Sequence, residues 1–317
     1  MRKLSYKKSV ELDLFGQFLV EKCVENKIDR VLDVGCGLGH LLGWIGEKLP
    51  NLELVGVDCN DSFCDKGTKI YGQVKFNVLE ISLENCQDFL DLLQNTGKRT
   101  ALISLHGCGD LQETLIKAFL KCNISKVPLL LTIGCCYHKT KKPDNWIISD
   151  FLKNQLGYVN INGSALRMGA EMRFNDYINM SEAERAKRLN SLMIRAVTEV
   201  FYQRNDINAL IEHRSRRRNL GNTISEAAEA IASRYGVEDD VKELWLKEML
   251  AIEQEFQGER DKIQLFLDIQ YSLQHVMESL ILLDRAQYVE ENGGTAELIP
   301  LFPTDISPRN TCLTVKR

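Results

Sequence analysis

The feature that most constrains this chain is the stretch from residue 30 to residue 61. An apolar run over 31–34 is followed by a glycine-rich turn at 35–39, a helical period over 40–49 and a second apolar run over 52–57. A short apolar run, a turn and a helical period in this order are typical of a strand–helix–strand unit. The glycines allow a sharp turn whose amide N–H groups lie at the start of the helix, where a ligand can bind.

The spacing of the glycines indicates which ligand binds. A dinucleotide-binding turn, G-x-G-x-x-G, would require glycine at position 40, where this chain has His40. The pattern present is Asp33-x-Gly35-x-Gly37-x-Gly39, with a carboxylate just before the turn. This pattern resembles the S-adenosylmethionine (SAM) turn of Rossmann-like methyltransferases. The resemblance implies SAM as cofactor and places Asp33 near its methionine ammonium group.

A second carboxylate strengthens the cofactor prediction. Asp58 follows Gly39 by 19 residues and ends the second apolar run, where its oxygens can accept hydrogen bonds from both ribose hydroxyls. In the fold that this resemblance implies, the end of the strand expected over 74–78 usually contacts adenine, so Asn77 could meet the base edge or could be a simple loop asparagine. The alternative is a glycine turn between two buried elements, with Asp58 as a helix cap. The predicted cofactor-binding residues are Asp33, Gly35, Gly37, Gly39, Asp58 and Asn77.

Composition and charge limit the class of protein and the kinds of partner that this chain can have. The chain has 317 residues, of which 44% are hydrophobic and 26% charged, as in ordinary globular proteins. The formal net charge of −4 gives no overall basic footprint for nucleic acid, so any such contact has to be local. There is no long apolar run and no signal-peptide pattern at the N-terminus. We therefore expect a soluble intracellular protein, cytoplasmic or nuclear, that does not contact a membrane.

The ten cysteines could serve as metal ligands or as disulfide partners. None forms a C-x-x-C pair, and an intracellular protein keeps its thiols reduced. Cys135 and Cys136, with Cys108, His106 and His138, offer ligand types that zinc prefers. Adjacent residues on a strand point to opposite faces, however, so Cys135 and Cys136 are not expected to share one site. We therefore predict no metal.

Two further strand ends are predicted to form the acceptor side of the site. Apolar runs over 100–105 and 128–133 end in SLHGCGDL and GCCYH, and ligands of open α/β sheets bind at such carboxyl ends. Histidine exchanges protons near neutral pH, although either histidine could simply shape the pocket. The sequence has no Asn/Asp-Pro-Pro-aromatic motif here, which argues against adenine N6 chemistry. The predicted catalytic residues are His106, Tyr137 and His138, and Asp110 is predicted to face the substrate.

The order of elements predicts a seven-stranded Rossmann-like α/β sheet with a helical insertion before its last strand. A sixth strand is expected over 157–162 and the last over 310–316, which gives a methyltransferase domain of residues 1–165 plus 300–317. Residues 166–299 have mostly helical periodicity. Within them, a basic cluster could contact RNA phosphates, or could be a solvated face paired with acidic helices. The cluster comprises Arg214, Arg216, Arg217 and Arg218.

Six sequence blocks, spread over nearly the whole chain and in the same order, resemble the methyltransferase-like protein 25 family. This family's domain is also labelled ribosomal RNA adenine methyltransferase domain-containing. The resemblance implies a SAM-dependent methyltransferase with a helical insertion before the last strand. Arg285 and Arg309, in the last two blocks, are predicted to neutralise a negative group of the substrate. The blocks are the Lys7-Lys8 helix, DVGCGLGHL (33–41), SLHGCGDL (104–111), GCCYH (134–138), ESLILLDRAQYVEE (278–291) and LFPTDISPRNTCLTVK (301–316).

The paired motifs LHxCG and CCYH are also similar to a eukaryotic tRNA 2′-O-ribose methyltransferase family, which has KHLCG and CCHH. Ser104 and Leu105 replace the lysine side of the first motif, Tyr137 replaces a histidine, and the family's upstream zinc-finger cysteines are absent. The prediction is a SAM-dependent methyltransferase with RNA as the expected acceptor. Two alternatives stay open: a protein or small-molecule methyltransferase, and a non-catalytic interaction module with a methyltransferase fold.

Overall fold

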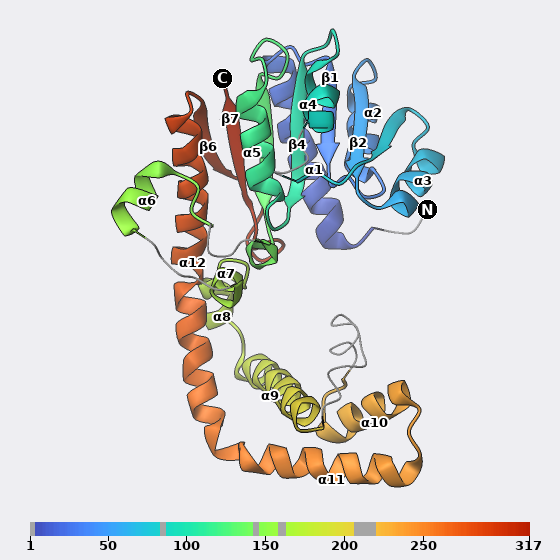
Figure 1. The fold of residues 1–317 in the computed structure, drawn as a ribbon, viewed down its shortest axis with the longest axis vertical. Helices are drawn as coiled ribbons and strands as arrows, with labels where there is room; N and C mark the ends of the chain where they lie inside the picture. The colour runs from blue at the N-terminus through green and yellow to red at the C-terminus, as the bar shows by residue number, and fades with distance from the viewer. Residues whose placement is uncertain (1–3, 83–86, 142–145, 158–162, 206–219) are drawn as a thin grey trace. The chain divides into compact units, whose positions relative to one another are not determined.

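The computed structural model describes residues 4–82, 87–141, 146–157, 163–205 and 220–317. A seven-stranded sheet organises it, in the order β3-β2-β1-β4-β5-β7-β6 (Figure 1). The predicted fold class, an α/β sheet of the Rossmann-like methyltransferase type, is confirmed. The strands are β1 (Arg30–Val34), β2 (Glu53–Asp58), β3 (Val74–Val78), β4 (Thr100–Gly107), β5 (Leu129–Gly134), β6 (Thr295–Pro300) and β7 (Thr311–Lys316).

The first five strands run parallel, and the last two form an antiparallel hairpin at one end of the sheet. β1 pairs with both β2 and β4, so Asp33 is beside Gly56 on one side and Ile103 on the other. β7 pairs antiparallel with β5 and with β6. Chain order therefore reverses between β1 and β4, and a ligand of an open sheet binds outside the carboxyl ends at such a switch point.

Consecutive side chains of the parallel strands are buried on opposite faces of the sheet, as expected for strands covered by helices on both sides. On one face, Val31 shares a core with Phe15 of α1 and Leu42 of α2. On the other face, Leu32 shares a core with Phe119 of α5 and with residues of α4 and the end of α12. The helices that precede or connect the strands are α1 (Tyr6–Glu25), α2 (His40–Lys48), α3 (Asp61–Ile70), α4 (Gln87–Gln94) and α5 (Leu111–Lys121).

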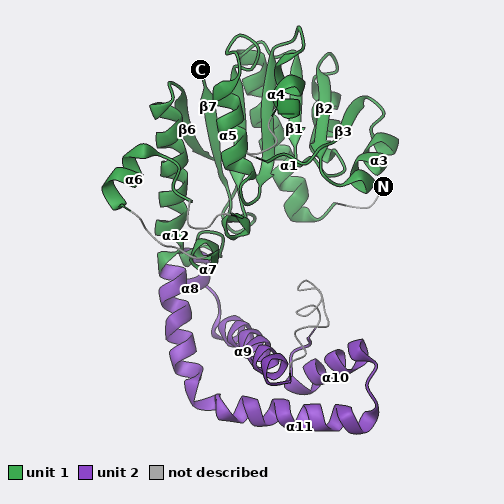
Figure 2. Cartoon of the chain, viewed as in Figure 1, with its two compact units in different colours: residues 1–174, 273–317 green, residues 175–272 purple. Residues whose placement is uncertain are grey.

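The chain divides into two compact units (Figure 2). Unit 1, residues 1–174 and 273–317, contains the sheet, and unit 2 comprises residues 175–272. The sequence predicted a longer insertion, residues 166–299. The observed boundary differs because α12 ends in unit 1, where it packs on the sheet and leads directly into β6. The remaining helices are α6 (Asp150–Leu156), α7 (Gly163–Met168), α8 (Phe174–Ile178), α9 (Glu182–Arg204), α10 (Ile224–Tyr235), α11 (Asp239–Glu255) and α12 (Arg260–Glu291).

Two carboxylates of α12 explain why its C-terminal part belongs to unit 1. Buried Asp284 accepts hydrogen bonds from the backbone N–H groups of Ile148 and Ser149, both with contacts of 2.9 Å. Glu291 accepts from the N–H groups of Asp150 and Phe151, at 2.8 Å each. These amides lie at the start of α6, where helix N–H groups have no partner within the helix. The end of α12 therefore caps α6.

Unit 2 has a core of its own. Residues of α9, α10 and α11 form it, including Val197, Phe201, Ile231 and Met249. α9 begins with a capping box in which the Ser181 side chain and Glu184 satisfy each other's backbone amides. Among the described residues, no helix combines the length and apolar content that crossing a membrane requires.

The seventh strand differs from the one expected. Residues 158–162 of the expected strand over 157–162 lie outside the described residues, and Gly157 is the C-cap of α6. The edge strand is instead β6, in residues that the sequence assigned to the insertion. Three of its side chains, Ala296, Leu298 and Ile299, are half-buried. The apolar pattern of β6 is weak because none of its side chains is fully buried.

Candidate functional site

The glycine turn has the backbone that its sequence predicts. Gly35, Gly37 and Gly39 all have positive φ angles, of 74°, 57° and 74°. Only glycine adopts this region without steric cost. The Gly35 N–H donates to the Val57 carbonyl at 2.8 Å, which ties the turn to the end of β2. The amide groups that follow lie at the start of α2.

Asp58 lies at the end of β2 and holds the turn through its side chain. Its Oδ2 accepts a hydrogen bond from the Gly37 N–H at 2.9 Å, and its Oδ1 accepts one from the Asn60 N–H at 2.9 Å. The helix-cap alternative for Asp58 is wrong, because Asn60 is the N-cap of α3 and its side chain accepts from the Phe63 N–H. Asp58 is thus held at the turn by two backbone contacts.

Asp33 is buried within β1, with 3% of its surface exposed. Loss of hydration and, to a smaller extent, the charge of Asp58 raise the pKa of this carboxyl to about 8, although Lys8 of α1 opposes the shift. The group is therefore largely protonated at neutral pH.

A cleft with a volume of about 410 Å³ opens beside the turn, within the range of small-molecule sites. Its walls come from the carboxyl ends of β1, β2 and β4 and from the segments after β3 and β5. The lining residues are Val34, Gly35, Val57, Asp58, Cys59, Leu79, Glu80, Ile81, Ser82, Cys108, Asp110, Leu111, Glu113, Lys117, Lys139, Thr140 and Lys141.

The cleft includes some predicted cofactor residues and adds others. Gly35 and Asp58 line it, whereas Asn77 lies within β3 beside Val57 and is not among the lining residues. The segment 79–82, which follows β3, provides the wall that Asn77 was expected to provide. Its residues have no common chemistry, so only their position after a strand could have indicated them.

Asp110 lines the cleft and joins two loops. Its carboxylate accepts hydrogen bonds from the Thr140 hydroxyl and, at 2.9 Å, from the Lys141 N–H. The side chain therefore connects the turn after β4 to the segment after β5. Both of its carboxylate oxygens take part in these contacts.

His106 lies in β4 and is directed toward α1. Its Nε2 is 3.5 Å from a carboxylate oxygen of buried Glu11. Burial opposes ionisation of Glu11, but hydrogen bonds from His106 and Ser307 outweigh it and lower the pKa of this carboxyl. His106 is not among the residues that line the cleft.

Tyr137 and His138 lie in a short 3-10 turn, η1 (Tyr137–Lys139), directly after β5. Tyr137 is buried against Trp146, Leu166 and Ile281, and burial raises the pKa of its hydroxyl. Burial also lowers the pKa of His138, whose Nδ1 has no hydrogen-bond partner among the described residues. Neither side chain lines the main cleft.

The two predicted substrate arginines are engaged within unit 1. The guanidinium of Arg285 donates to the Trp146 carbonyl at 2.6 Å and pairs with its neighbour Asp284. Arg309 donates to the Glu171 carbonyl at 2.7 Å. The structure therefore shows both side chains in contacts with the protein itself. The basic cluster from Arg214 to Arg218 lies outside the described residues.

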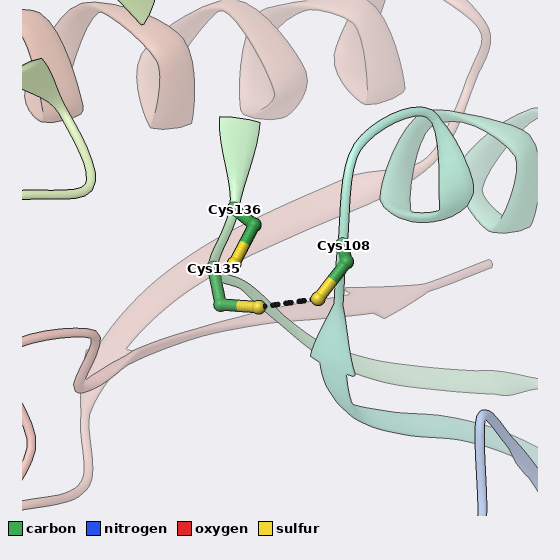
Figure 3. Close-up of side chains that lie close together, drawn as sticks. All are labelled: Cys108, Cys135 and Cys136. Carbon is green, nitrogen blue, oxygen red and sulfur yellow. Dashed lines mark hydrogen bonds between the residues drawn. The ribbon is translucent and has the colours of Figure 1, made fainter. Parts of the chain in front are cut away.

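Three cysteines converge at the ends of β4 and β5 (Figure 3). The Sγ atoms of Cys108 and Cys135 are 2.8 Å apart, and all three sulfurs, including that of Cys136, lie within 4.8 Å of one another. The expectation that Cys135 and Cys136 point to opposite faces is wrong, because β5 ends at Gly134 and strand alternation ends with it. Hydrogen bonds from Cys108 and Cys135 lower the pKa of Cys136, while the pKa of Cys135 is raised by its hydrogen bond with Cys108.

Comparison with known families gives a match over the N-terminal part of the chain. Residues 7–143, which include the first five strands, match a family model described as a methyltransferase domain. This part of the chain is therefore similar to a methyltransferase domain.

Solved structures with related folds include several methyltransferases. The plantazolicin methyltransferase BpumL, in complex with a triazolic desmethylPZN analog and SAH, is 17% identical over 51% of this chain and 55% of its own, with a TM-score of 0.31. The plantazolicin methyltransferase BamL is 15% identical over 50% and 53%, with a TM-score of 0.32. The methyltransferase domain of bacterial CtHen1 is 14% identical over 38% and 65%, with a TM-score of 0.30. The chain thus spans between about half and two thirds of these structures, and likenesses at these TM-scores add nothing to the family match.

Proposed function

We propose that this protein is a SAM-dependent methyltransferase whose cofactor binds in the cleft beside the glycine turn. The observation that carries the proposal is the hydrogen bond from the Gly37 N–H to Asp58. It joins the glycine turn to the carboxylate at the end of β2, the two parts of the predicted cofactor motif. The cleft lies at the switch point of the sheet, where ligands of such folds bind. The match of residues 7–143 to a methyltransferase domain agrees with this assignment.

Asp58 has acceptor capacity left for a ribose. An ionised carboxylate offers about four lone-pair positions, and the contacts to Gly37 and Asn60 use one on each oxygen. Each oxygen can therefore accept one further hydrogen bond, which matches the two neighbouring hydroxyls of a ribose. The two backbone contacts also fix the orientation of the carboxylate before the cofactor arrives.

Methyl transfer is an in-line displacement from a sulfonium, so positioning and exclusion of water supply most of the catalysis. A base is needed only when the accepting atom carries a proton at working pH. His106 and His138 stay the predicted candidates for that role, and unchanged turnover in His106→Ala would remove the first of them. Asp110 is better suited to positioning, because both of its oxygens hold the loop after β5.

The finer proposal is that the acceptor is RNA. Lys139 lines the cleft and can contact a phosphate, whereas Lys117 and Lys141, which also line it, pair with the carboxylates of Glu113 and Glu80. The sequence resemblance to the methyltransferase-like protein 25 family and to a tRNA 2′-O-ribose methyltransferase family supports the same acceptor class. A protein or small-molecule acceptor is the competing assignment.

Incubation of the purified protein with tritiated SAM and a cell extract tests both levels of the proposal. RNase-sensitive label that is absent with Asp58→Ala, but present with the exposed control Asp65→Ala, would support an RNA methyltransferase. Protease-sensitive or small-molecule label would support a methyltransferase, but its acceptor would be a protein or a small molecule and not RNA. No label in any fraction from a folded protein would favour the non-catalytic interaction module.

A further inference from the structure

We propose that Cys108, Cys135 and Cys136 bind a zinc ion at the rim of the sheet, beside the cleft. Their three sulfurs lie within 4.8 Å of one another. With Zn–S bonds of about 2.3 Å, two thiolates on one tetrahedral zinc are separated by about 3.8 Å. Small side-chain rotations would therefore bring the three sulfur atoms to the separations that a bound zinc ion requires. Thiolates are the ligands that zinc prefers.

The topology brings the thiols together. β4 and β5 are neighbouring parallel strands, and Gly107 pairs directly with Gly134 at their ends. The next residue of each strand is a cysteine, so Cys108 and Cys135 leave the sheet side by side. Cys136 then turns back toward them, because its backbone has left the strand (Figure 3).

Backbone contacts hold this arrangement in place. The Cys136 carbonyl accepts hydrogen bonds from the Gly109 N–H at 3.1 Å and from the Lys139 N–H at 2.9 Å. Gly109 has a φ of +59°, and a Cβ there would lie 2.7 Å from the Lys139 carbonyl oxygen. The two cysteine loops are therefore fixed to each other without help from the sulfurs. A site arranged in this way needs little ordering when the metal binds.

Three other cysteines show a contrast. Cys23, Cys122 and Cys312 are buried in the apolar cores on the two faces of the sheet, where a thiol packs as a small hydrophobic group. Cys108 and Cys136 are only half-buried. Cys108 also lines the cleft, so an ion can reach the cluster from solvent and would lie next to the cleft wall.

Three protein ligands leave one position of a tetrahedral zinc open. In zinc sites with three protein ligands, water or a substrate group takes this position. A zinc ion here would join the ends of β4 and β5 beside the cleft that Cys108 lines. Metal binding itself does not require methyltransferase activity.

Titration of the reduced, metal-free protein with Zn²⁺ and Co²⁺, without any methyl donor, tests this site. We expect one equivalent of Zn²⁺ to bind and to raise the Tm. We also expect Co²⁺ to give the intense thiolate absorption of a tetrahedral sulfur site. Cys136→Ser and Cys108→Ser should each weaken Zn²⁺ binding by more than about 100-fold. Substitution of residues that only support a metal ligand costs up to about 100-fold in affinity, and loss of a ligand itself should cost more. Cys59→Ser changes an exposed cysteine outside the cluster and should bind like the wild type.

Circular dichroism of each variant separates loss of a ligand from loss of the fold. No Zn²⁺ binding by the folded, reduced wild type would overturn the proposal. Equal binding by the wild type and both cluster variants would overturn it as well. A disulfide between Cys108 and Cys135 in protein purified without reductant, with no metal uptake after reduction, would replace the metal site by a redox pair.

Discussion

The two halves of the sheet's carboxyl edge are built differently. At β1 and β2 the groups proposed to bind the cofactor are mainly backbone: three glycines with positive φ, their amides, and the carboxylate of Asp58, which is held by the N–H groups of Gly37 and Asn60. At β4 and β5 they are side chains that meet across neighbouring strands: three thiols, Asp110 and Thr140. In the proposed function the first half therefore recognises the cofactor largely through its backbone, and the second half is where side-chain substitutions would change the chemistry.

The largest expected effect tests the backbone half. Gly39→Ala forces an alanine into a positive φ and places its Cβ 2.6 Å from the Phe76 ring, which is also packed against Gly56 and Gly67. Strain and overpacking together should lower the free energy of unfolding by about 3 kcal/mol. Gly37→Ala is the matched control, because a Cβ there meets nothing within 4 Å and only strain of about 1 to 2 kcal/mol remains. Urea unfolding of both variants measures the difference, and equal losses would contradict this packing account.

The second prediction concerns the buried carboxyl of the same half. Because the pKa of Asp33 is raised to about 8 in the folded protein, the folded state binds a proton that the unfolded state releases above its ordinary pKa of 3.8. Stability should therefore fall as the pH rises from 5 to 8, by roughly 3 kcal/mol from this group. Asp33→Asn should remove that dependence, while the exposed control Asp65→Asn should keep it. Parallel curves for the wild type and Asp33→Asn would show that Asp33 is ionised in the fold.

The third prediction concerns the side-chain half. Asp110→Ala removes the acceptor for the Thr140 hydroxyl and the Lys141 N–H and should lower the free energy of unfolding by about 1 to 2 kcal/mol. Hydrogen exchange of the Lys141 amide should rise in the same variant. Asp150→Ala, which loses an exposed ion pair with Lys153, should change stability by less than about 0.5 kcal/mol. Equal effects of the two changes would mean that Asp110 does not hold the loop.

The smallest effect is expected where α1 meets β4. The pKa of Glu11 is lowered in the folded protein, so its stabilising contribution is present above its ordinary pKa of 4.5 and is lost as the pH falls through the lowered value. Glu11→Gln should therefore reduce the loss in the free energy of unfolding at acidic pH, by less than about 1 kcal/mol. His106→Ala should reduce the same acid-dependent loss. If neither variant changes it, the His106–Glu11 pair does not contribute to the stability of the fold.

The difference between the halves also explains what could be predicted from the sequence. Asp33, the three glycines and Asp58 lie within 26 consecutive residues, so one strand–helix–strand pattern was enough to place them. The meeting of Cys108 with Cys135 and Cys136 depends on the pairing of β4 with β5 and on the residue where β5 ends. β5 ends at Gly134, before both cysteines, so strand alternation does not separate Cys135 from Cys136. β6 was missed because its pattern at the sheet edge is weak.

The measurement that tests the central proposal most directly is calorimetric titration of the purified protein with SAM and with S-adenosylhomocysteine. We expect micromolar binding of both. Asp58→Ala should weaken it by about 100-fold or more, because two hydrogen bonds to a charged group are lost. Asp65→Ala should bind like the wild type. A well-folded wild type that binds neither compound, or an Asp58→Ala variant that binds as tightly as the wild type, would contradict a cofactor site at the glycine turn.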